Sequence, residues 1–272
     1  MPELPEVETV KNELLPHVVG RHITGISLIW EGIVKEPLVE EFCSRITGQE
    51  ITGITRRGKY LFVSLSSCDL LIIHLKMTGS LLIGQDSSEP PKYTRAIIHL
   101  DKDTNVFFRD PRKFGLMRLV KDKNSIVSKL GPEPLEAEFT PQVLAQRLAK
   151  RTAPIKALLL EQGFIAGIGN MYADEALFAA KIHPLRSGES LSQEEIKRLH
   201  SAIQRILWAA IGNKGASVDT YFRPDGTEGT AHFEFKVAHG LGGKICSNCG
   251  GPIERIVVRN RGTYFCPNCQ PE

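Results

Sequence analysis

The chain has 272 residues, of which 42% are hydrophobic and 24% are charged, and its formal net charge at pH 7 is +3. This length predicts two or three domains, and the composition is that of an ordinary globular protein with ample material for a core. No membrane-spanning helix is expected, because the longest apolar stretch, residues 70–83, is interrupted by His74, Lys76 and Thr78. No charged-then-apolar leader is seen, so we expect a cytoplasmic protein.

The first predicted element is a helix that begins beside Pro2. Proline suits a first turn, Glu3 and Glu6 complement the helix dipole, and the inner stripe is apolar: Val7, Val10 and Leu14. Removal of Met1, which a small second residue permits, would also leave a secondary amine at the start of the chain. An α-amino group has a pKa of about 8, against about 10.4 for lysine, so far more of it is unprotonated at neutral pH. Such an amine can attack an aldehyde-like carbon. The simpler interpretation is that these residues only begin a helix, but the same residues can begin a helix and supply a nucleophile.

Residues 21–120 are predicted to form short strands separated by turns, the pattern of a β-sandwich or barrel. Eight segments are β-branched or aromatic: residues 22–29, 51–54, 60–65, 70–75, 80–83, 96–100, 106–109 and 116–120. The sequence Gly-Pro-Glu-Pro at 131–134 then marks a boundary, beyond which the pattern becomes helical.

Besides the helix over residues 171–177, which follows a glycine turn, three helical segments are predicted after this boundary. Thr140 can cap the first, with Pro141 at its first position, and residues 155–161 form the second. The third follows a capping box from Ser192 to Glu195, has one apolar face and ends at Gly212. Residues 213–235 show no periodicity, and a loop of this length is usually functional or disordered.

The C-terminal segment contains two C-x-x-C pairs separated by 16 residues: Cys246, Cys249, Cys266 and Cys269. This spacing predicts a tetrahedral zinc site, and two disulfides are the less favoured alternative in a protein expected inside the cell. Residues 236–272 also carry as much net positive charge as the whole chain. Arg261 lies between the pairs, where it could contact phosphate or be an ordinary exposed arginine.

Other candidate residues lie in turns. Lys59 lies near the start of a strand, and Met77 and Phe114 lie in loops with basic neighbours. Apolar side chains so placed could wedge into a stack of bases, although buried loop anchors are the default. Asn170 follows a glycine turn that precedes a helix and could help to hold an anion, although ordinary turns between helices look the same.

Taken in order, five motifs resemble the formamidopyrimidine-DNA glycosylase family. They are PELPEVET at the start, HLKMTG at 74–79, DPRKFG at 110–115, GIGNMYADEALF at 167–178 and the four-cysteine finger. The resemblance spans nearly the whole chain and implies an α+β multidomain fold. Its expected parts are an N-terminal helix with a β-sandwich (1–128), a helix-two-turn-helix domain with a lesion-capping loop (129–235) and a finger with one structural Zn²⁺ (236–272).

The same resemblance implies a base-excision repair enzyme that removes oxidised purines, chiefly 8-oxoguanine and formamidopyrimidines, from duplex DNA. Pro2 would attack the sugar and form a Schiff base while Glu3 acts as the acid. Lys59 would assist β-elimination, and Arg261 would assist δ-elimination. A monomer that binds double-stranded DNA and no membrane is expected.

The implied DNA contacts come from both halves of the chain. Lys59, Asn170 and Arg261 would hold phosphates, and three residues would fill the gap left by the extruded nucleotide: Met77, Arg112 and Phe114. Glu6 and the 213–235 loop would surround the extruded base. Further DNA-contact positions are matched by His74, Tyr93, Arg151 and Lys156.

The match departs from the family at one place and leaves two rivals. Residues 237–240 read Val-Ala-His-Gly where the family often has Val-Tyr-Gly-Arg, which puts one DNA-contact surface in doubt. The endonuclease VIII-like branch prefers oxidised pyrimidines and usually begins PEGPE, whereas this chain has Leu4 and the Arg112–Phe114 spacing. A non-catalytic DNA-binding zinc protein is the other rival, and borohydride trapping would separate it from an enzyme.

Overall fold

The computed structural model describes residues 1–218, 220–238 and 240–272, so His239 of the unusual Val-Ala-His-Gly segment lies outside the described residues. The chain forms two compact units. One comprises Met1–Ser128 with Asn213–Thr230, and the other comprises Lys129–Gly212 with Ala231–Glu272. In the described part of the chain, every helix is too short or too polar to cross a bilayer.

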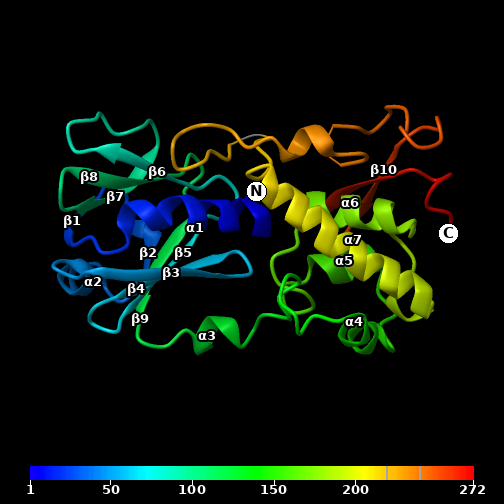
Figure 1. Cartoon of the computed structure of the whole chain (residues 1–272), viewed down its shortest axis with the longest axis horizontal. Helices are drawn as coiled ribbons and strands as arrows, with labels where there is room; N and C mark the ends of the chain where they lie inside the picture. Colours follow the sequence, from blue (N-terminus) through cyan, green and yellow to red (C-terminus); the bar gives the residue numbers. More distant parts are fainter. Residues whose placement is uncertain (219, 239) are drawn as a thin grey trace. The chain divides into compact units, whose positions relative to one another are not determined.

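The first unit is a β-sandwich, as expected, and all eight predicted strands are present (Figure 1). One sheet is antiparallel in the order β1-β7-β8-β6, and the other has the order β2-β9-β5-β4-β3, with β2 parallel to β9. The strands are β1 Ile23–Leu28, β2 Val34–Glu36, β3 Ile51–Arg57, β4 Tyr60–Leu65, β5 Leu70–His74, β6 Ser80–Gln85, β7 Thr94–Leu100, β8 Thr104–Arg109 and β9 Leu116–Val120.

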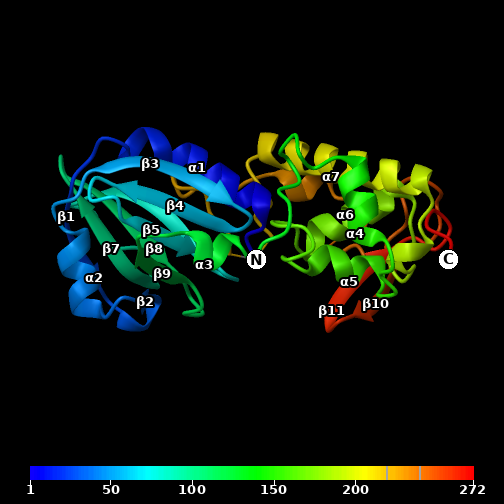
Figure 2. The same cartoon turned by 90° about the horizontal axis from the view of Figure 1, so that it is seen from below.

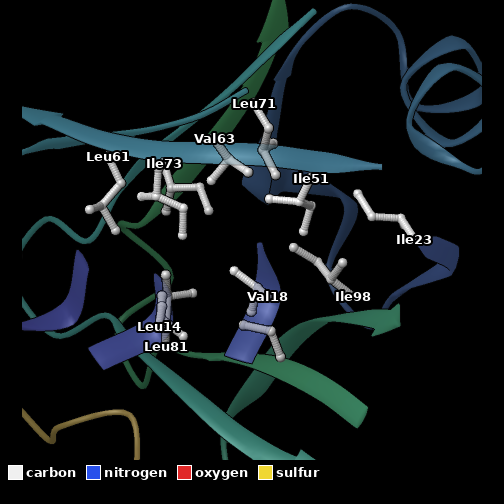
Figure 3. A pocket seen from close by; sticks show the side chains of 12 residues that line it. Leu14, Val18, Ile23, Ile51, Leu61, Val63, Leu71, Ile73, Leu81 and Ile98 are labelled. Carbon is white, nitrogen blue, oxygen red and sulfur yellow. The ribbon is translucent and has the colours of Figure 1, made fainter. Parts of the chain in front are cut away.

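Helix α1 (Leu4–Val18) lies along β3 and contributes to the core between the sheets (Figure 2). The predicted stripe of Val7, Val10 and Leu14 is buried. Within this core lies an apolar cavity of about 30 Å³. Figure 3 shows Leu14 and Val18 of α1 on one side of it and side chains of β3, β4 and β5 on the other, among them Val63.

Four short elements of this unit were not predicted: η1 (Glu31–Ile33), β2, α2 (Val39–Ile46) and α3 (Asn124–Val127). The interpretation of residues 21–120 as strands was therefore wrong at α2. This helix has eight residues and buries two side chains, Phe42 and Ile46. Two apolar positions do not establish a helical period, so only packing reveals the element.

The second unit is helical and ends in a hairpin. Its helices are α4 Pro141–Leu148, α5 Ile155–Leu160, α6 Asn170–Ala180 and α7 Gln193–Gly212, with short turns η2 Gly188–Ser190 and η3 Ala231–Glu234. The predicted caps are confirmed: the Thr140 hydroxyl accepts from Val143 N, and Ser192 and Glu195 exchange backbone-to-side-chain hydrogen bonds. Strands β10 (Glu254–Val258) and β11 (Arg261–Phe265) form the hairpin, and β11 packs against α6.

Candidate active site and nucleic-acid interface

The start of α1 gathers two carboxylates beside the candidate nucleophile. Pro2 is buried, and Glu3 and Glu6 are each 1% exposed. The Glu3 backbone N–H donates to Glu6 Oε2 at 2.7 Å, and the Ala216 N–H donates to Glu6 Oε1 at 2.8 Å. One carboxylate therefore joins the first turn of α1 to the 213–230 loop, and it fixes the backbone next to Pro2.

The 213–230 loop is docked on the first unit through several contacts. Arg223 pairs with Glu13 of α1, with Nη2 2.8 Å from Oε1, and Ile83 N donates to Pro224 O at 2.8 Å. Tyr221 is buried, and burial together with the nearby carboxylates of Glu6 and Glu13 raises the pKa of its phenol. Residues 213–218 and 220–230 therefore pack against α1 and the sandwich.

Lys59 lies in the turn between β3 and β4. Gly58 adopts a φ of +56°, which lets the chain reverse there, and Lys59 is 6% exposed. The preceding Arg56 reaches α1, where its Nε donates to Glu8 Oε2 at 2.6 Å. The turn that carries Lys59 is thus tied to the helix that carries Glu3 and Glu6.

The loops after β5 and β8 bring the three predicted wedge residues together. Arg112 Nη1 lies 3.8 Å from Met77 Sδ, and its guanidinium lies 4.7 Å from the Phe114 ring centroid. Phe114 is 45% exposed, so the default interpretation of a buried loop anchor was wrong for it. An arginine between two apolar side chains, presented on loops, is suited to filling space in a base stack.

Asp110 organises these loops, and the sequence reasoning did not single it out as a site residue. Its fully buried carboxylate accepts from the Thr78 hydroxyl and from the Phe114 and Gly115 N–H groups at 2.7 Å, and Arg112 N lies 3.2 Å from Oδ1. The signal was an aspartate before a proline at a loop start, where its oxygens can accept from following N–H groups.

His74, at the end of β5, is held neutral. It is 8% exposed, its Nδ1 accepts from Lys76 N at 2.9 Å, and its ring meets that of Tyr60 edge-on. Burial, then the charges of Lys76 and Lys59, lower its pKa from 6.5 to about 3. Because Nδ1 is an acceptor, the proton lies on Nε2, and His74 can donate one hydrogen bond without carrying charge.

Tyr93 lies on the surface in a strained backbone conformation. It is 41% exposed and has a φ of +72°, which is rare for an aromatic residue. Its ring lies 5.0 Å from the Lys92 ammonium and 5.7 Å from the Arg109 guanidinium. This basic setting agrees with a phosphate-facing position.

In the second unit, Lys156 differs from its expected position as a DNA contact. Its side chain is 0% exposed, and Nζ donates to Asn170 O at 2.7 Å and to Asp174 Oδ1 at 2.6 Å. Burial raises the pKa of Asp174 to about 7, while the Lys156 ammonium acts against this shift. Lys156 therefore fixes the start of α6 from inside the unit, because a buried ammonium needs these partners.

Helix α6 also holds the hairpin. Asn170 Nδ2 donates to Gly262 O at 2.8 Å, and Tyr264 N donates to Asp174 Oδ2 at 3.2 Å. Arg261, the first residue of β11, is exposed. Arg151 is also accessible, with 44% of its side chain exposed. Asn170 and Arg261 thus belong to one connected structure.

The four cysteines meet as the spacing predicted. Their Sγ atoms all lie within 4.8 Å of one another, with Cys246–Cys269 at 3.9 Å and Cys249–Cys266 at 3.5 Å. Zn–S bonds of about 2.3 Å in a tetrahedron require sulfurs about 3.8 Å apart, whereas a disulfide requires about 2.05 Å. The donor set therefore fits one structural Zn²⁺ and excludes the two disulfides.

Three family models match the chain. They describe the formamidopyrimidine-DNA glycosylase N-terminal domain (residues 1–117), the formamidopyrimidine-DNA glycosylase H2TH domain (130–221) and a zinc finger found in FPG and IleRS (243–271). A formamidopyrimidine-DNA glycosylase of Chloroflexus aurantiacus is 46% identical, with 99% of this chain and 98% of that protein covered. One of Geobacillus kaustophilus is 40% identical, over 99% of this chain and 100% of that protein.

Solved structures of related proteins are similar to this structure along nearly the whole chain. A Lactococcus lactis Fpg mutant in complex with Fapy-dG containing DNA is 37% identical, with a TM-score of 0.93 and both chains fully covered. The Lactococcus lactis Fpg bound to abasic-site DNA is 38% identical, with a TM-score of 0.92 over 99% of this chain and 100% of that chain. The chain therefore belongs to the formamidopyrimidine-DNA glycosylase family and is a bifunctional DNA glycosylase and AP lyase of base-excision repair.

Proposed function

We propose that this protein excises oxidised purines, chiefly 8-oxoguanine and formamidopyrimidines, from duplex DNA through a covalent intermediate on Pro2. The observation that carries the proposal is the first turn of α1, where Glu3 and Glu6 are buried beside Pro2 and Glu6 fixes the local backbone. Removal of Met1 converts the Pro2 peptide nitrogen into a secondary amine, the required nucleophile.

The reaction uses the residues of both units. The Pro2 nitrogen attacks the sugar C1′, the bond from C1′ to the base breaks, and the departing base takes up the proton that the Pro2 nitrogen loses. Glu3 protonates the ring oxygen as the C1′–O4′ bond breaks and the ring opens to an iminium. Lys59 assists β-elimination on the 3′ side of the sugar, and Arg261 assists δ-elimination on the 5′ side. Zn²⁺ holds the finger that carries Arg261 and takes part in no step.

The target carbon is inaccessible in a stacked duplex, so the nucleotide must be extruded at a cost of a few kcal/mol. Met77, Arg112 and Phe114, which already lie together, offset this cost by filling the gap, with Arg112 facing the orphaned cytosine. Lys59, Asn170 and Arg261 hold phosphates, and Glu6 with the 213–235 loop surrounds the base. His74, Tyr93 and Arg151 add DNA contacts, and Lys156 acts through Asn170 and Asp174.

The same proposal includes that the protein acts in the cytoplasm as a monomer. The functional domains are the catalytic sandwich (1–128), the helix-two-turn-helix region with its lesion-capping loop (129–235) and the finger (236–272).

Borohydride reduction tests the covalent step. The processed protein, with Pro2 first, should become covalently joined to a duplex that contains 8-oxoguanine opposite cytosine. A glycine-serine extension placed before Pro2 should abolish trapping, whereas the same extension placed after Glu272 should leave it intact. Trapping by the N-terminally extended protein would refute Pro2 as nucleophile.

The endonuclease VIII-like alternative is tested with the same assay. A duplex that contains thymine glycol should be trapped and cut much more slowly than one that contains 8-oxoguanine. Faster processing of thymine glycol would overturn the purine assignment while leaving the Pro2 chemistry in place.

A further inference from the structure

Two arginines from distant segments of the second unit converge on one exposed carboxylate. Glu161 follows the last residue of α5, and each of its oxygens pairs with a different guanidinium. Arg151 Nη2 lies 3.1 Å from Oε2, and Arg259 Nη1 contacts Oε1. The three side chains remain accessible to solvent, with exposed fractions of 44% for Arg151, 32% for Glu161 and 52% for Arg259.

Arg259 occupies an unusual position for an arginine. It and Asn260 form the tip of the β10–β11 hairpin, and their φ angles are +46° and +58°. A two-residue hairpin loop with positive φ at both positions strongly favours asparagine, aspartate and glycine. The arginine adds strain at this site, and strained residues concentrate where a side chain has a task.

The pair with Glu161 is not the main attachment of the hairpin. Asn170 Nδ2 donates to Gly262 O at 2.8 Å, and Asp174 Oδ2 accepts from Tyr264 N at 3.2 Å. Both contacts involve the backbone of β11, and Asp174 is buried. The exposed contact between Arg259 and Glu161 can therefore break, and Arg259 can take another partner, without releasing the hairpin.

Arg151 is also supported from a second side. Its guanidinium lies 5.8 Å from the Phe164 ring centroid, and that of Arg147 lies 5.5 Å from the same centroid. Arg147 in turn donates to the Phe164 and Gly163 carbonyls, with Nε 2.7 Å from Phe164 O. The Phe164 ring lies near both guanidinium groups, so Arg151 does not depend on Glu161 alone for its place.

We propose that Arg151 and Arg259 form a binding site for a phosphodiester of the DNA backbone, which the Glu161 carboxylate occupies in the free protein. This site deepens the proposed function and rests on it. Guanidinium groups bind phosphate oxygens in the same forked geometry as carboxylate. Exposed ion pairs contribute little stability, whereas a phosphate contact also releases counterions from the duplex. Glu161 therefore restrains binding to undamaged DNA, and a correctly placed phosphate displaces it.

The test is binding of an undamaged duplex, measured by fluorescence anisotropy between about 50 and 200 mM salt. Glu161→Gln should bind about threefold to tenfold more tightly at the lower salt concentration, because two guanidinium groups are released. Arg259→Ala should bind more weakly, and the slope of log affinity against log salt should become shallower by about 0.9. Zinc content and thermal unfolding of each variant should match the parent protein.

Glu194→Gln is the matched control, because Glu194 pairs with Lys197 at 2.9 Å on the exposed start of α7. Its affinity should equal that of the parent. The proposal is overturned if Glu161→Gln binds no more tightly than Glu194→Gln, or if Arg259→Ala keeps the parent salt slope. The binding test uses a duplex without a lesion, so its result does not depend on catalysis. If the variants show these binding effects but the parent protein cannot be trapped on a lesion duplex by borohydride, the catalytic proposal is refuted and the binding site is not.

Discussion

The neutral state of His74 makes the sandwich sensitive to acid. Its pKa is lowered from 6.5 to about 3 in the folded protein, first by burial and then by Lys76 and Lys59. A lowered pKa in the folded state means that the unfolded chain binds the proton more readily. The stability that results is complete above the unfolded pKa of 6.5 and is lost as the pH falls towards 3.

The size of the effect follows from these two values. At about pH 5 the unfolded histidine is protonated and the folded one is not, and the 1.5 pH units below 6.5 correspond to about 2 kcal/mol of unfolding free energy. His74→Asn should remove this dependence. The asparagine Oδ1 lies near the position of Nδ1, so it can still accept from Lys76 N.

Urea unfolding with a single tryptophan isolates the first unit. The chain has two tryptophans, and Trp208→Phe at an exposed site of α7 leaves Trp30 as the reporter. Between about pH 7.5 and pH 5, the unfolding free energy of the Trp208→Phe protein should fall by about 2 kcal/mol more than that of its His74→Asn derivative. His17→Asn, at an exposed position of α1, should behave as the parent. Equal acid losses with and without His74 would refute the reasoning.

Three further outcomes are expected. Lys59→Ala should slow 8-oxoguanine processing more than cutting of a preformed abasic site, measured as single-turnover rates; equal losses on both substrates would reject that separation. Asp110→Asn removes charge-assisted hydrogen bonds worth about 1.5–3 kcal/mol each, so affinity for a lesion duplex should fall at least about tenfold; parent-like affinity would show that the loops hold their shape without this carboxylate. Val63→Ile adds one methylene beside the cavity of about 30 Å³ and should raise the unfolding free energy by about 0.8 kcal/mol, whereas Val257→Ile, at a 62% exposed site, should not; a loss of stability would indicate overpacking.

The features that could be predicted from the residues alone are those encoded by nearby positions. Short β-branched or aromatic segments between turn residues identified all eight predicted strands, and Thr140 and the Ser192–Glu195 box located two helix starts. The cysteine spacing identified the metal ligands, because C-x-x-C pairs place two sulfurs on one turn. The motifs also identified the family, since each preserves a local arrangement of reactive groups.

Only the tertiary structure decided which distant groups share a site. It showed that Glu6 holds Ala216, that Asp110 supports Arg112, and that Lys156 lies inside the protein where a DNA contact was expected. Strand and helix periods report which face of an element is buried, but they do not report its partner. Burial and long-range hydrogen bonds depend on how segments pack, so these roles became visible only in the folded chain.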